Sequence, residues 1–165
     1  MQSSFYNKIF QRSLAEKLLS FFIFLTISLL FWSILVFILS KSSWSFIGSN
    51  WVFKKLYTTL YLTYFILLSL SSFLLWQKFS FKKLKLEISF FLSIFFLSTF
   101  WNYTFLFKHD YFISLITILF TLFFSIVLNM LIWKKTKVAA IIFSNCSLWI
   151  LYLFILNMVA SITNY

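Results

Sequence analysis

The chain has no proline, one glycine and one cysteine among its 165 residues. With Gly48 as its one glycine, the chain should form uninterrupted helices, because transporters with broken membrane helices need glycine or proline at the breaks. The lone cysteine, Cys146, excludes an intramolecular disulfide, and no cysteine–histidine cluster has the spacing of a zinc site. Disulfide scaffolds and zinc modules are therefore excluded.

Acidic side chains are the other scarce class, with three acidic residues against fourteen basic ones. Glu16, Glu87 and Asp110 all fall at or beyond the ends of the apolar segments, and His109 lies in the same turn as Asp110. Ionisable groups deep in a membrane usually mark an ion or proton path, so this pattern argues against a proton-coupled pump. It also argues against an intramembrane hydrolase, since no catalytic triad, carboxylate pair or metal-ligand set would be buried. His109 could ligate haem iron, but a polar cap in a turn is the favoured reading.

What the chain has in abundance is apolar sequence: 62% of residues are hydrophobic, 25% are aromatic and 10% are charged. Such a composition lies outside the range of soluble domains. A bilayer core of about 30 Å takes about 20 apolar residues in a helix, and helices satisfy the backbone where water is absent. The sequence thus predicts an all-α integral membrane protein, a bundle of five transmembrane helices occupying residues 18–165 after an N-terminal segment 1–17. The spans are expected at residues 18–40, 55–76, 88–107, 111–133 and 138–162.

The cations are unevenly divided between the two expected faces of the membrane. Ten would lie on the side of the N-terminus and four on the other side, so the positive-inside rule predicts a cytoplasmic N-terminus. Anionic lipid headgroups, rather than nucleic acid, are the expected partners of these charges. The ten are Lys8, Arg12, Lys17, Lys78, Lys82, Lys83, Lys85, Lys134, Lys135 and Lys137; the four are Lys41, Lys54, Lys55 and Lys108.

Polar and aromatic residues within or near the spans are the remaining candidates for function. An amide inside a span needs a partner helix or a ligand, and interhelical bonding is the favoured role. Tryptophans near span ends are expected in an interfacial belt. The amides are Asn129, Asn145 and Asn157, and the belt tryptophans are Trp76, Trp101 and Trp133.

Trp44 and Trp51 fit the belt less well, because they bracket the one loop of substance, residues 41–50. Two indoles beside Lys41, Lys54 and Lys55 would form a flat apolar wall with cations at its rim. Such a site suits a planar hydrophobic molecule that carries carboxylates. Belt or loop packing of the two indoles is the alternative.

At these residues the sequence resembles the TspO/MBR family of tryptophan-rich sensory proteins and translocator proteins. Residues 50–61 read NWVFKKLYTTLY, similar to the family pattern N-W-V-F-x-x-[LV]-[WY]-T-x-L-Y, and residues 41–44 resemble its K-P-x-W. Further on, Trp101 with Phe105 looks like the family's W-x-x-x-F. The last span places Trp149, Leu156, Asn157 and Asn164 in the family's order.

The resemblance implies a five-helix bundle that binds porphyrin or haem in a pocket capped by the first loop. Other hydrophobic ligands are a further implication of the resemblance. It implies a receptor or transporter with no required cofactor, surrounded by membrane lipid. The ligand-binding residues carried over are Trp44, Trp51, Tyr57, Tyr61, Ser98, Trp101, Trp149 and Asn157, with Lys41 and Lys54 as the rim for ligand carboxylates.

The chain also departs from the family pattern. The prolines before Trp51 and after Trp101 are missing, and Leu153 stands where the family usually has a small residue facing ligand. The bulk of Leu153 puts sterol binding in more doubt than tetrapyrrole binding. Family members often dimerise through small residues, and in this chain Ser89 and Ser93 are the small residues that remain at such a face. A homodimer is therefore one of the alternatives for the assembly.

Two alternatives to binding remain open at this point. One is photo-oxidative degradation of porphyrin that depends on tryptophan. The other is a structural membrane subunit without a ligand. Binding without catalysis is the favoured prediction, since the spans hold no dedicated catalytic group.

Overall fold

The computed structural model describes residues 13–41 and 51–163, with residues 51–54 and 81 described in their backbone alone. The described chain is all-helical, and its five long helices are each apolar enough to cross a membrane. A π-helical turn, η1, continues the third helix. The prediction of an all-α five-helix membrane fold is therefore confirmed. The elements are α1 (Leu14–Lys41), α2 (Trp51–Lys78), α3 (Phe81–Asn102), η1 (Tyr103–Phe107), α4 (Tyr111–Trp133) and α5 (Lys137–Thr163).

The helices extend further than the apolar segments that predicted them. α1 already begins at Leu14, where Ser13 and Glu16 form a capping box: the Glu16 N–H donates to Ser13 Oγ at 3.2 Å and the Ser13 N–H donates to Glu16 Oε2 at 2.9 Å. α3 begins at Phe81 rather than at residue 88. Its first turns carry lysines, whose apolar stems can lie along the bundle while their ammonium groups reach the interface.

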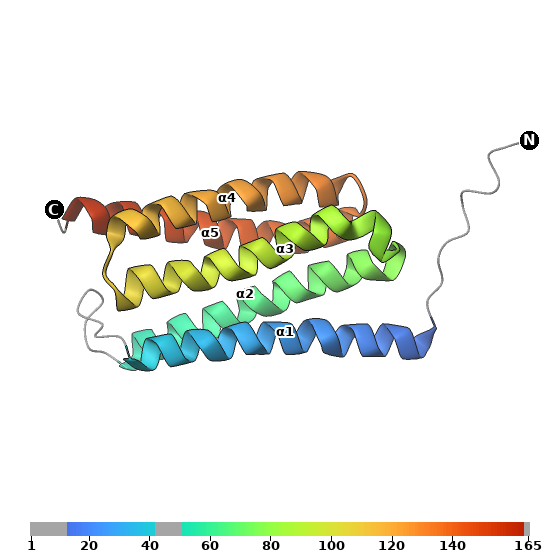
Figure 1. Ribbon diagram of the computed structural model, residues 1–165, viewed down its shortest axis with the longest axis horizontal. Coiled ribbons are helices and arrows are strands. Elements are labelled where there is room, and N and C mark those ends of the chain that lie inside the picture. The colour runs from blue at the N-terminus through green and yellow to red at the C-terminus, as the bar shows by residue number, and fades with distance from the viewer. Residues whose placement is uncertain (1–12, 42–50, 164–165) are drawn as a thin grey trace, which may run out of the picture.

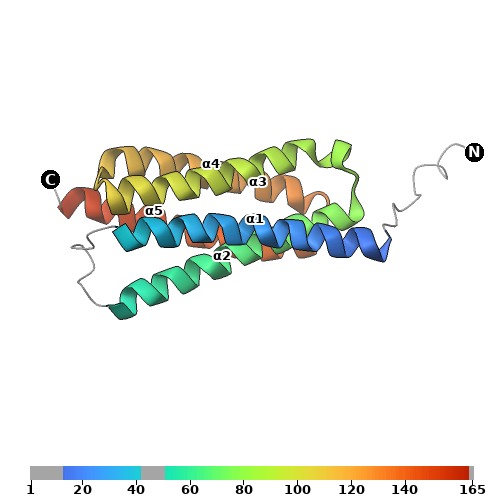
Figure 2. The same cartoon turned by 60° about the horizontal axis from the view of Figure 1, so that its bottom comes forward.

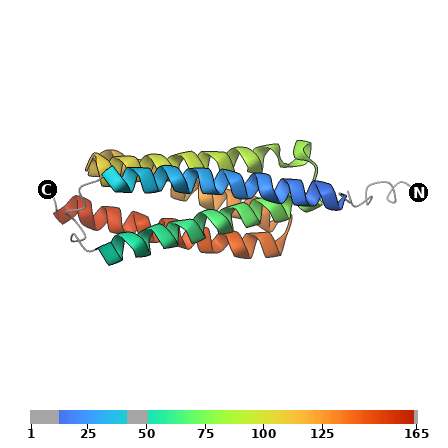
Figure 3. The same cartoon turned by 90° about the horizontal axis from the view of Figure 1, so that it is seen from below.

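The five helices form a ring in which neighbours pack side by side. α1 packs on α2, α2 on α5, α5 on α4 and α4 on α3, whereas α1 and α3 close the ring through sparse contacts. Figure 1 shows the helices running nearly parallel to one long axis, and Figure 2 and Figure 3 show α1 lying between α2 and α3. The seam between α1 and α3 is the loosest part of the ring.

One end of the bundle holds most of the described cations. There α1 begins, α2 turns into α3 and α4 turns into α5, as Figure 1 shows at its right-hand side. We call it the basic end; its described cations are Lys17, Lys78, Lys82, Lys83, Lys85, Lys134, Lys135 and Lys137. The other end, where α1 and α5 finish, is called the loop end.

Hydroxyl groups bond the helices to one another across the interior. Ser28 Oγ donates to the carbonyl oxygen of Phe65 at 2.8 Å, and Ser69 Oγ donates to that of Phe24 at 2.6 Å, so both bonds join α1 to α2. Ser71 Oγ donates to the carbonyl oxygen of Ala139 at 3.0 Å and joins α2 to α5. Lipid gives no hydrophobic drive for helices to associate, so such bonds and close packing hold the bundle.

Glu87 lies inside α3 and not at a helix end, because the helix begins at Phe81. Its side chain is 4% exposed and forms a 2.6 Å ion pair with Lys135 Nζ. Lys135 Nζ also donates to the carbonyl oxygen of Lys83 at 2.7 Å and lies over the Phe79 ring. Lys135 thus ties the turn between α4 and α5 to the turn between α2 and α3.

The turn between η1 and α4 depends on two adjacent residues. His109 has a φ of 53°, in the left-handed region, and so reverses the chain. Asp110 is the cap of α4, since its Oδ1 accepts from the Ile113 N–H at 3.0 Å. The expected polar cap in this turn is therefore the aspartate rather than the histidine.

Replacing Asp110 with alanine is expected to lower the free energy of unfolding by about 1 kcal/mol, the usual cost of losing an N-cap acceptor. Asp110→Asn keeps an acceptor in the same place and should stay close to the unsubstituted protein. Thermal unfolding of purified protein in detergent compares the two variants. Equal losses in both would show that the cap bond does not stabilise α4.

Candidate functional site

Part of the predicted pocket lies outside the described residues. Trp44 lies outside them, and the side chains of Trp51 and Lys54 also lie outside them. The backbone of Trp51 is described as the first residue of α2. Lys41 ends α1 at the loop end with an exposed side chain. The carboxylate rim of Lys41 and Lys54 therefore stays a prediction.

The other six predicted residues lie on α2, α3 and α5 towards the loop end: Tyr57, Tyr61, Ser98, Trp101, Trp149 and Asn157. Of these, Tyr61 and Trp149 are in direct ring contact. Their rings belong to a line of four aromatic side chains, here called the aromatic row: Tyr57, Tyr61, Trp149 and Tyr152. Successive ring centroids are 4.9 Å, 5.7 Å and 5.3 Å apart. Tyr61 is 0% exposed, Trp149 is half-buried, and Tyr152 is 53% exposed. The row therefore leads from the outer surface of the bundle to its interior.

Trp101 lies in the core and not in an interfacial belt. It is 0% exposed, stacks on Phe105 at 4.8 Å, and donates from Nε1 to Asn157 Oδ1 at 2.9 Å. Asn157 Nδ2 in turn donates to the carbonyl oxygen of Tyr111 at 3.1 Å. The belt prediction for Trp101 is wrong, whereas the prediction of an interhelical bond by Asn157 is confirmed.

The other two amides behave differently from each other. Asn129 Nδ2 donates to Ser144 Oγ at 3.0 Å and so joins α4 to α5, as predicted. Asn145 is exposed and donates to the carbonyl oxygen of Ile141 on its own helix at 3.1 Å. The expected interhelical bond of Asn145 is not found among the described residues.

Two residues of this region, Tyr64 and Asn102, were missed by the sequence analysis. The Tyr64 hydroxyl and Ser98 Oγ are 2.9 Å apart, and the Tyr57 hydroxyl donates to Asn102 Oδ1 at 2.7 Å. The sequence did contain a signal for Tyr64. Its spacing from Tyr57 and Tyr61, four residues and then three, places the three tyrosines on one helix face. Together these bonds fix the tyrosines of α2 against α3.

Two polar atoms of the aromatic row make no hydrogen bond to the part of the chain that the structure describes. The Tyr61 hydroxyl and Trp149 Nε1 are both buried, and neither has a hydrogen-bond partner among the described residues. Leaving a buried polar group unpaired costs about 1–3 kcal/mol. Within the described residues, Trp149 Nε1 therefore offers a donor without an acceptor, and the Tyr61 hydroxyl beside it lies close to the side chains of Tyr57 and Asn102.

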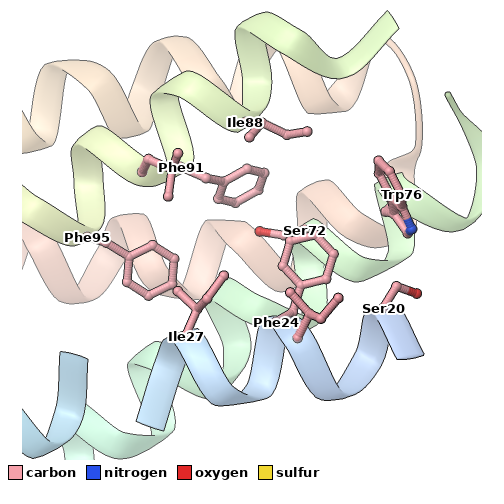
Figure 4. Close-up of a pocket in the computed structure, with 10 residues that line it drawn as sticks. Ser20, Phe24, Ile27, Ser72, Trp76, Ile88, Phe91 and Phe95 are labelled. Carbon is pink, nitrogen blue, oxygen red and sulfur yellow. The ribbon is translucent and has the colours of Figure 1, made fainter. Parts of the chain in front are cut away.

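A cavity among the described residues lies elsewhere, near the basic end. It has a volume of about 280 Å³ and lies between α1, α2 and α3, as Figure 4 shows. Trp76, expected in the belt, lines it. The cavity thus does not coincide with the pocket predicted under the first loop. Its lining residues are Ser20, Ile23, Phe24, Ile27, Ser72, Trp76, Ile88, Phe91, Leu92 and Phe95.

Comparison with known families decides which kind of protein this is. Residues 39–162 match the model of the TspO/MBR family, which is most of the chain. The chain belongs to the TspO/MBR family. This membership implies a membrane translocator or sensory protein, and TspO/MBR proteins are known to bind porphyrins. Neither the curated proteins nor the solved structures gave a match.

Within residues 13–41 and 51–163, no three histidine, cysteine or acidic side chains gather as a metal site would require. The aromatic row is the candidate site at the loop end of this TspO/MBR protein.

Proposed function

We propose that this TspO/MBR protein binds a tetrapyrrole, porphyrin or haem, against the aromatic row and acts as a receptor or transporter for it. The observation that carries the proposal is a pair of buried donor atoms on neighbouring rings, Tyr61 Oη and Trp149 Nε1, which have no hydrogen-bond partner among the described residues. A porphyrin offers flat π-faces for the rings and carboxylate acceptors for the donors.

The row also suggests a route for the ligand. Because Tyr152 is exposed and Tyr61 is fully buried, a ring arriving from the bilayer meets Tyr152 and Trp149 first. It must displace Trp149 before it can reach the Tyr61 hydroxyl. One propionate would accept from the donors of the aromatic row, and Lys41 and Lys54, predicted at the loop end, would hold the other.

Titrating protoporphyrin IX into purified protein tests the proposal through the shift of the porphyrin absorbance band. Trp149→Phe and Tyr61→Phe keep an aromatic ring and remove one donor each, so each is expected to weaken binding about tenfold, the equivalent of one buried hydrogen bond. Absorbance is the suitable signal because the substitutions themselves change tryptophan fluorescence.

Trp133→Phe is the matched control, since Trp133 is exposed at the basic end. It should leave the affinity for protoporphyrin IX unchanged. If the double variant Tyr61→Phe/Trp149→Phe folds and binds as tightly as the control, the aromatic row is not the porphyrin site.

We further propose that the basic end faces the cytoplasm, because the positive-inside rule places the lysine-rich end there.

The outer side of α3 is the proposed face for a homodimer. It carries Ser89 and Ser93, which line a shallow depression together with Leu92 and Phe96. A homodimer through this face would bring two α3 helices together at small side chains.

A further inference from the structure

We propose that the cavity between α1, α2 and α3 binds one acyl chain of an anionic membrane phospholipid, whose headgroup is held by Lys17 and Lys85. This site is separate from the aromatic row and lies towards the opposite end of the bundle. The inference therefore stands independently of the proposed porphyrin binding.

The cavity interior suits a hydrocarbon chain. Phe91 and Phe95 are buried in it, and its two serine hydroxyls are already bonded within their own helices. Ser20 Oγ donates to the carbonyl oxygen of Lys17 at 3.0 Å, and Ser72 Oγ donates to that of Leu68 at 2.9 Å. The walls thus leave no polar group in need of a ligand. A volume of about 280 Å³ is just below that of ordinary ligand pockets, roughly 300–1,000 Å³, and suits part of one acyl chain.

The mouth of the cavity opens towards lipid between α1 and α3. Ile23 on α1 is 50% exposed and Leu92 on α3 is 42% exposed, and both belong to the lining. Figure 4 shows side chains of α1 and of α3 approaching the cavity from opposite sides, with Ser72 and Trp76 of α2 contributing the third wall. This mouth coincides with the sparse seam of the ring. A chain can therefore enter sideways from the bilayer.

On each of the two helices that flank the mouth, the residues that line the cavity follow one helix face, here called a lining stripe. Lys17 extends the stripe of α1, and Lys85 extends that of α3. On α1 the residues Lys17, Ser20, Phe24 and Ile27 are spaced by three, four and three positions, which places them on one helix face. On α3 the residues Lys85, Ile88, Leu92 and Phe95 repeat the same spacing. Each lysine thus lies about one turn beyond the cavity, in the direction of the membrane surface.

Within the described residues, neither of these two lysines forms an ion pair with an acidic side chain. Glu16 is engaged in the capping box with Ser13, and Glu87 is paired with Lys135. Asp110 caps α4 at the loop end. A phosphate headgroup between Lys17 and Lys85 supplies the missing negative charge, while a zwitterionic headgroup supplies no net charge. Each lysine near the surface is worth about 1 kcal/mol to such an anion, which is about fivefold in affinity.

Native mass spectrometry of delipidated protein in detergent tests the proposal by measuring the dissociation constant of the first bound lipid. Phosphatidylglycerol should bind at one copy at least tenfold more tightly than phosphatidylcholine with identical chains. The variant Lys17→Gln/Lys85→Gln is expected to lose about 25-fold in affinity for phosphatidylglycerol. Ser72→Phe, which fills the cavity, should abolish the tight copy.

The control Lys134→Gln/Lys137→Gln removes two charges from the same end, one from the turn after α4 and one from the start of α5. It should change the affinity less than twofold. Equal losses of phosphatidylglycerol affinity in the two double variants would mean that the overall charge of the basic end attracts the lipid, and not Lys17 and Lys85 in particular. Equal affinities for phosphatidylglycerol and phosphatidylcholine would mean that no headgroup site exists. Either result overturns the proposal, as does a folded Ser72→Phe variant that still binds. If Ser72→Phe does not fold, Ile27→Trp fills the same cavity.

Discussion

Trp101→Ala is expected to lower the free energy of unfolding by about 3–5 kcal/mol, the usual cost of truncating a fully buried tryptophan to alanine. The side chain is completely enclosed and stacks on Phe105, so its removal leaves a void that the neighbouring helices can fill only in part. It also leaves Asn157 Oδ1 without the indole N–H that now donates to it. Denaturation in mixed detergent micelles, followed by circular dichroism, measures the loss.

Trp133→Ala is the matched control for this prediction. Trp133 is 52% exposed, and it ends α4 at the basic end. Its loss should cost less than about 1 kcal/mol, since an exposed side chain leaves no cavity when it is truncated. If Trp101→Ala is no more destabilising than Trp133→Ala, Trp101 does not occupy the core.

Lys135→Met should destabilise the bundle by about 3–5 kcal/mol, because it leaves the nearly buried carboxylate of Glu87 without its partner. The second substitution Glu87→Gln removes the unpaired charge, so the double variant should recover most of the loss. The same denaturation measurement on the wild type, both single variants and the double variant gives the coupling free energy of the pair.

Lys137→Met serves as the control for the pair, since Lys137 is exposed at the start of α5. It should change the unfolding free energy by less than about 0.5 kcal/mol. Additive losses in the Glu87–Lys135 cycle would show that the two side chains stabilise the bundle separately rather than as an ion pair.

The five helices could be predicted from the sequence because length and apolarity alone decide whether a segment spans a bilayer. Their ends could not, since lysines at the membrane surface interrupt the apolar sequence without ending the helix. α3 shows this, as its helix includes Lys82 and Lys85 before the predicted span begins.

The burial of particular residues was harder to predict, for a physical reason. In lipid the outer face of a helix is as apolar as its inner face, so the sequence carries little amphipathic signal. Trp101 was expected in the belt from its position along the span, but its side chain faces α5 and bonds to Asn157. The cavity was missed for the same reason, because it depends on which helices adjoin in the ring. The stripes led by Lys17 and Lys85 are the sequence signal that could have found it.

The arrangement of hydrogen bonds around α1 has a mechanical consequence. Ser28, Ser69 and Trp32 fasten α1 to α2, the Trp32 indole N–H donating to the carbonyl oxygen of Thr58 at 3.1 Å. Contacts with α3 on the other flank are few. The first helix is therefore held to the bundle mainly through α2, whereas its flank towards α3 relies on apolar packing such as that of the Phe31 ring on Phe95 and Phe96. A substitution that weakens the α1–α3 flank should accordingly leave the polar fastening of α1 to α2 intact.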